Sequence, residues 1–239
     1  MKLVFLLAIT SSFLLGDVLN FKRSDLQKVS YLQDKRKPLY KPVNENNYTP
    51  SKVTFSKEIA YKKDEIFKSI DSYNNDDFYE IYDNVLTYME KNNSQNLVNY
   101  IKNPEMIIFL KEHYKSMLKT IAYNESGFKH TVGLMDPDDV SYFQINIKKN
   151  IWPLSKLENI TNTNQITREQ LIEDYNFAGK VALHVLIYNA GLYASINKIN
   201  IPNESHLIKF IASYNNPTKL KDYYMQSAKS FLVSLWFFW

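Results

Sequence analysis

The residue best suited to acid–base chemistry in this chain is Glu125, within residues 122–128, Ala-Tyr-Asn-Glu-Ser-Gly-Phe. It lies 18 residues after Ile107, which is about five helical turns, so it continues the apolar stripe of a helical pattern. A carboxyl group on a buried face loses the hydration of its charged form, and we therefore expect its pKa to rise. A carboxylic acid that stays protonated near neutral pH can act as a general acid.

A second group of polar side chains follows at residues 139–146, Asp-Val-Ser-Tyr-Phe-Gln-Ile-Asn. The amides of Gln144 and Asn146 can donate to and accept from the hydroxyl and amide groups of a ligand. Asp139 lies five residues before Gln144 and is the candidate second carboxylate. Asp139 therefore has two open roles. It is either a second catalytic carboxylate or an acceptor of hydrogen bonds from backbone amides in a turn.

Helical periodicity predicts the elements that must position these residues. Pro104 is suited to the first position of a long helix that ends near Asn124, just before Glu125. The other expected helices begin near Lys57, after a cap at Asp76–Asp77, after the capping box of Thr167 and Gln170, after a cap at Ser205, and near Thr218. The helix after Thr167 is expected to end or be interrupted at residues 189–191, Asn-Ala-Gly. Alternating strand patterns are almost absent, so the predicted fold class is mainly α.

Composition excludes several classes of function. The chain has 239 residues, with 29 Lys and Arg against 25 Asp and Glu, for a net charge of +4. This charge suits an anionic polymer but is too small to indicate a nucleic-acid partner. Because there is no cysteine, disulfides, thiolate metal sites, a Cys nucleophile and lipidation on cysteine are excluded. The four histidines show no metal-binding spacing, and neither a metal nor a cofactor is expected.

The N-terminal residues predict export. Residues 1–16 combine one positive charge, a short apolar run and a small residue, as in a secretory signal peptide, with an uncleaved anchor as the alternative. Residues 17–56 are expected to be a polar tether, residues 57–101 accessory helices, and residues 102–239 the main domain. The aromatic run of residues 231–239 fits a helix end docked on the core, or a contact with a membrane or partner protein.

Residues 125–128, Glu-Ser-Gly-Phe, and the segment 139–146 together resemble the first two motifs of the lysozyme-like lytic transglycosylases, which cut bacterial peptidoglycan. The second segment is similar to the Asp-x-Gly-x-x-Gln-Ile-Asn form, found in members linked to conjugation and secretion and in C-type lysozymes; here Ser141 replaces the Gly. Residues 174–179 and 212–215 resemble the third and fourth motifs. The resemblance covers roughly residues 103–230.

The resemblance implies a lysozyme-like domain of the α+β lysozyme superfamily, here with extra N-terminal helices. It implies that Glu125 is the only acid and base, cleaving the bond between N-acetylmuramic acid and N-acetylglucosamine and leaving a 1,6-anhydro product. The substrate-binding residues it implies are Ser126, Phe143, Gln144, Asn146, Tyr214 and Asn215. The expected partners are peptidoglycan strands and an envelope-spanning assembly, in the periplasm or cell envelope.

Two alternatives stay open. The first is a hydrolytic muramidase that uses Glu125 together with Asp139, since glycoside hydrolysis normally takes two carboxylates. The second is a non-catalytic glycan-binding or scaffold protein, in which Ser141 and the pair Asn216–Pro217 distort the site. Ser141 matters here because Gly permits a positive φ and Ser adopts one reluctantly.

Overall fold

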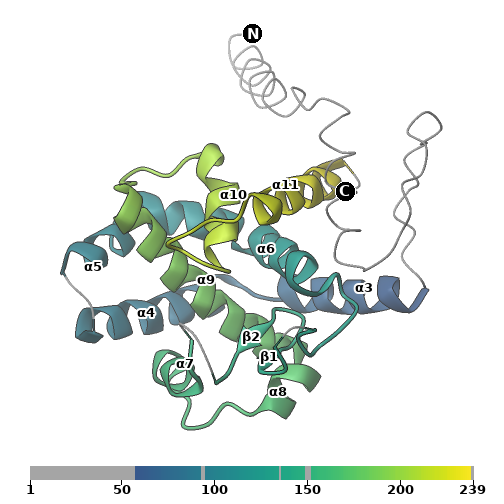
Figure 1. Cartoon of the computed structure of the whole chain (residues 1–239). Coiled ribbons are helices and arrows are strands. Elements are labelled where there is room, and N and C mark those ends of the chain that lie inside the picture. The colour runs from purple at the N-terminus through teal and green to yellow at the C-terminus, as the bar shows by residue number, and fades with distance from the viewer. Residues whose placement is uncertain (1–56, 93–94, 135, 149–151, 238–239) are drawn as a thin grey trace. The chain divides into compact units, whose positions relative to one another are not determined.

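The computed structural model describes residues 57–92, 95–134, 136–148 and 152–237. Over these residues the chain forms nine helices and one small two-stranded antiparallel sheet (Figure 1). The elements are α3 (Lys57–Asp71), α4 (Asn75–Asn92), α5 (Gln95–Ile101), α6 (Pro104–Ser126), β1 (Asp139–Val140), β2 (Ile145–Asn146), α7 (Leu154–Thr161), α8 (Arg168–Glu173), α9 (Tyr175–Asn197), α10 (Glu204–Ser213) and α11 (Asp222–Phe237). The prediction of a mainly helical fold is confirmed.

The predicted signal peptide and tether, residues 1–56, lie outside the described residues. Where the chain is described, none of its helices is both long and apolar enough for a bilayer crossing. Residues 55–231 group into one compact unit, which contains every residue of the site described below.

Helix α9 is the centre of this unit. Fifteen of its residues are buried, so it is apolar on nearly all faces, as expected for a helix surrounded by others. It packs against α3, α4, α5, α6, α7, α8 and α10 (Figure 1). The helices of residues 57–101 therefore form layers on the same central helix that supports α6 and α10.

Several predicted helix starts are confirmed, and two predicted caps are wrong. Pro104 opens α6 behind the cap Asn103, and Thr167 and Gln170 form a capping box. Helix α4 is capped by Asn74, not by Asp76–Asp77: the Asn74 side chain accepts from Asp77 N, and the Asp77 side chain accepts from Asn74 N. Helix α10 is likewise capped by Asn203, whose Oδ1 accepts from Ser205 N at 3.0 Å, so Ser205 is not the cap.

The helix predicted to follow Thr167 is two helices. Helix α8 ends after six residues, and Asp174 then caps α9 by accepting from Phe177 N at 2.9 Å. The predicted interruption at residues 189–191 is also wrong, because α9 runs through it to Asn197. Gly191 serves close packing there: a Cβ atom at this position would lie 2.3 Å from Ile101 Cγ1 on α5.

Candidate active site

Glu125 lies in the last turn of α6, which continues two residues beyond the predicted end. Gly127 terminates the helix in the left-handed conformation, φ 58°, and its N–H donates to Tyr123 O. Gly adopts this conformation without the steric cost that a Cβ atom brings. The Glu125 side chain is half-buried, as expected for a residue that continues the apolar stripe of the helix.

Ser126 and Phe128 hold the turn that follows the glutamate. Ser126 Oγ donates to Ala122 O at 2.8 Å and accepts from Phe128 N at 3.1 Å. The Phe128 ring is buried and contacts the ring of Phe67 edge-on at 5.7 Å between centroids. Ser126 is itself buried, so the predicted substrate-binding residue fixes the backbone next to Glu125 and does not line the pocket.

The second motif forms the hairpin of β1 and β2. Both Ser141 (φ 67°) and Gln144 (φ 49°) in its turn have left-handed backbone conformations. Ser141 Oγ accepts from Phe143 N at 3.1 Å, and Gln144 Nε2 donates to Ser141 O at 2.7 Å. Ser141 thus takes up the positive φ that the Gly of the motif would take, with local side-chain hydrogen bonds stabilising it.

Asp139 and Asn146 face each other across the hairpin. They are paired in register, and Asn146 Nδ2 donates to Asp139 Oδ1 at 2.8 Å. Burial raises the pKa of Asp139; the hydrogen bond from Asn146 opposes this shift, and the charges of Asp136 and Asp138 add to it. The pKa is raised overall, so the site disfavours the charged form of this second carboxyl group.

Tyr214 connects the hairpin to the helices. Its side chain is buried, and its hydroxyl donates to Phe143 O at 3.0 Å. Its own carbonyl oxygen accepts from Asn189 Nδ2 of α9 at 3.0 Å. The Tyr214 hydroxyl therefore ties the end of α10 to the turn of the hairpin.

Tyr224 of α11 holds the glutamate. Its hydroxyl donates to Glu125 Oε1 at 2.8 Å. Burial, followed by the charge of Glu125, raises the pKa of Tyr224 well above its usual value, so the phenol stays protonated as a donor. Asn124 fixes the start of α11 beside it: Asn124 Nδ2 donates to Tyr224 O at 3.2 Å, and Ser227 Oγ donates to Asn124 Oδ1 at 2.7 Å.

These elements enclose a pocket of about 140 Å³. Its lining comprises Glu125, Asp139, Gln144, Ile145, Asn146, Trp152, Val185, Tyr214 and Asn215. The structure therefore brings together six of the residues predicted from the sequence, from three separate segments. Phe143, predicted to bind substrate, is 1% exposed and is not among the lining residues, so its side chain supports the hairpin from below.

Three residues of the site were not predicted from the sequence: Tyr224, Trp152 and Val185. Val185 lies in the apolar pattern of α9, and nothing in that pattern separates it from its core neighbours. Tyr224 bonds to a residue 99 positions earlier, a distance over which periodicity carries no signal. Its position in the chain, just after the fourth motif, was the only cue to its role.

Among the described residues, no cluster of three or more His, Asp or Glu side chains could hold a metal ion. No protein-family model, curated protein or solved structure matches the chain.

Proposed function

We propose that this protein is a peptidoglycan lytic transglycosylase that cleaves the β-1,4 bond between N-acetylmuramic acid and N-acetylglucosamine, with Glu125 as the single acid and base. The observation that carries the proposal is the pocket itself. One carboxyl group at a helix end is fixed by a buried phenol, and it opens onto a lining of amide and aromatic side chains. Amides and aromatic rings are suited to a polar ligand with hydroxyl, acetamido and sugar-ring surfaces.

The first step is protonation of the glycosidic oxygen. Glu125 is half-buried and lines the pocket, so its carboxyl group can reach the glycosidic oxygen of a bound strand. Tyr224 holds Oε1, which limits rotation of the carboxyl group and gives it one defined direction of proton transfer. As the bond between C1 of the muramic acid and the glycosidic oxygen breaks, Glu125 becomes a carboxylate. The hydrogen bond from Tyr224 then becomes charge-assisted and stronger.

In the second step the Glu125 carboxylate takes the proton from the 6-hydroxyl of the same muramic acid. That oxygen forms a new bond to C1, closing the 1,6-anhydro ring, and the glutamic acid is regenerated. No water is consumed. The side-chain amides of Gln144, Asn146 and Asn215 line the same pocket and are suited to hold the sugar while its 6-hydroxyl approaches C1.

Asp139 has a structural role that the lyase accommodates, because the lyase needs no second carboxylate. Its Oδ1 accepts from Asn146 Nδ2 at 2.8 Å across the hairpin. The hydrolytic muramidase stays the second candidate, because Asp139 lines the same pocket as Glu125. Asp139→Asn separates the two: the lyase keeps its products, while the muramidase loses turnover.

The proposed function implies a fold, a location and partners. The fold is a lysozyme-like domain with extra helices at its N-terminal side. Because peptidoglycan lies outside the cytoplasmic membrane, the protein is exported to the periplasm or cell envelope, where its partners are glycan strands and an envelope-spanning assembly. Membrane contact through the N-terminal segment or the aromatic C-terminus stays a prediction from the sequence.

The test is the loss of turbidity of purified sacculi incubated with the full chain. Glu125→Gln keeps the size of the side chain and removes the proton, so it should abolish lysis. Glu112→Gln, an exposed position on the same helix, is the matched control and should lyse sacculi as the parent does. Equal lysis by both variants would refute the role of Glu125. Absence of lysis by the parent would favour the non-catalytic glycan-binding or scaffold alternative.

A further inference from the structure

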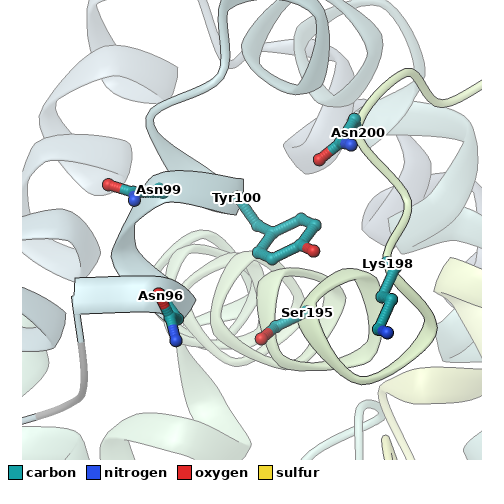
Figure 2. Close-up of a pocket in the computed structure, with 6 residues that line it drawn as sticks. All are labelled: Asn96, Asn99, Tyr100, Ser195, Lys198 and Asn200. Carbon is teal, nitrogen blue, oxygen red and sulfur yellow. The ribbon is translucent and has the colours of Figure 1, made fainter.

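A second and larger pocket, of about 520 Å³, lies where α5 meets the C-terminal end of α9. Its lining comprises Asn96, Asn99, Tyr100, Ser195, Lys198 and Asn200. Figure 2 shows the Tyr100 ring extending from α5 towards the side on which α9 supplies Ser195 and Lys198. No residue of this lining is shared with the pocket around Glu125.

The lining has the chemistry of a carbohydrate site. Asn96 and Asn99 lie three residues apart on α5 and so share a face, and Asn200 adds a third amide. Each amide offers both donors and an acceptor, which suits hydroxyl and acetamido groups. Tyr100 supplies an aromatic ring on which a sugar can pack.

The charge of the lining indicates which class of ligand the pocket can bind. Among the described residues that line this pocket, Lys198 is the only charged side chain, and none of them carries a carboxylate. The pocket is therefore suited to a neutral or anionic ligand and not to a cation. One ammonium group matches one carboxylate, whereas a nucleic-acid backbone calls for a cluster of basic side chains.

We propose that this pocket is a second, non-catalytic binding site for an N-acetylated glycan strand whose attached peptides carry carboxylates. The identity of this ligand rests on the proposed function; the existence of the site does not. The amides and Tyr100 contact the sugars, and Lys198 contacts a carboxylate. Lys198 is suited to this because it caps the C-terminus of α9 in the left-handed conformation, φ 55°, at the exposed rim of the pocket.

The two pockets are joined by one rigid element. Val185 lines the pocket around Glu125 and Ser195 lines the second pocket, and both belong to α9. Ten residues of helix separate them, which is about 15 Å along its axis. Two sites held at a fixed spacing on one protein bind a polymer more tightly than either does alone, because the second contact is intramolecular. The second site therefore keeps the enzyme on the wall between cuts.

The test measures binding of the full chain to purified sacculi by co-sedimentation, in a Glu125→Gln background that leaves the polymer intact. Asn96→Ala/Asn99→Ala removes two of the amides and introduces the better helix former, so α5 is retained. Its affinity for sacculi should fall about tenfold, which is about 1.4 kcal/mol. Asn92→Ala, at an exposed position on α4 outside both pockets, is the matched control and should bind as the parent does.

Lys198→Asn tests the charge, since Asn tolerates the left-handed backbone. It should weaken binding to intact sacculi and leave binding unchanged for sacculi whose peptides an amidase has removed. Thermal melts of every variant exclude unfolding as the cause of lost binding.

The outcomes separate this inference from the proposed function. If Asn96→Ala/Asn99→Ala binds sacculi as Asn92→Ala does, the second site is refuted, whether or not the parent enzyme cuts peptidoglycan. If the double variant loses binding while the parent releases no products, the second site stands and the proposed catalytic activity fails.

Discussion

Tyr224→Phe removes one hydroxyl from the site and leaves the ring in its buried place. The Tyr224 hydroxyl donates to Glu125 Oε1 at 2.8 Å, and the Tyr224 side chain is only 3% exposed, so water cannot readily replace it. A hydrogen bond to a charged group contributes about 1.5–3 kcal/mol. Loss of this bond disfavours the carboxylate form of the glutamate by that amount.

The effect appears in the pH dependence of turnover. The first step needs the protonated acid, so the basic limb of the pH–rate profile follows ionisation of Glu125. At about 1.36 kcal/mol per pH unit, the loss of 1.5–3 kcal/mol moves this limb up by about one to two pH units. Turnover at the optimum also falls, because the carboxyl group is no longer held in one orientation.

The assay is the rate of release of soluble muropeptides from sacculi across the pH range. Tyr223→Phe is the matched control, because Tyr223 is the neighbouring residue of the same helix and is 41% exposed. It should keep the profile of the parent. A folded Tyr224→Phe variant with an unmoved basic limb and parental turnover would refute the role given to this phenol.

Two further changes test the core. Burial lowers the pKa of His184 to about 4 from 6.5, so the unfolded state binds its proton first, and stability is lost as pH falls from about 6.5 to about 4. This lowering of the pKa corresponds to about 3 kcal/mol of stability lost in acid. In His184→Gln, the free energy of unfolding measured in urea should therefore fall less as the pH decreases. An unchanged pH dependence would contradict this reasoning. Gly191→Ala should lower the free energy of unfolding by about 1–3 kcal/mol, since its Cβ would lie 2.3 Å from Ile101 Cγ1. Ile101→Ala in the same chain should restore part of that loss, and a stabilised Gly191→Ala would show that helix propensity outweighs the packing.

Local patterns in the sequence predicted the helices and the segments of the pocket. Pro104 and the pair Thr167 and Gln170 are helix-start signals that act within a few residues, and both were confirmed. Periodicity alone placed Glu125 on the buried face of the helix, and its side chain is half-buried because α6 continues through it. Short-range chemistry of this kind can be read without knowledge of the rest of the fold.

Long-range packing accounts for what could not be predicted. Gly191 reads as a helix breaker, yet it continues α9 because α5 packs too closely for a side chain. Asp174 ends one helix and starts the next, because its side chain caps α9. Tyr224 reaches Glu125 only when α11 lies beside the end of α6, a contact that no local pattern encodes.

The central claim is that Glu125 alone performs an anhydro-forming cleavage, and mass spectrometry of the released muropeptides tests it most directly. Sacculi are digested with the full chain, Glu125→Gln and Asp139→Asn. The account predicts products lighter by one water than hydrolytic muropeptides from the parent and from Asp139→Asn, and none from Glu125→Gln. Products with a reducing end that disappear in Asp139→Asn would contradict it and establish a two-carboxylate muramidase.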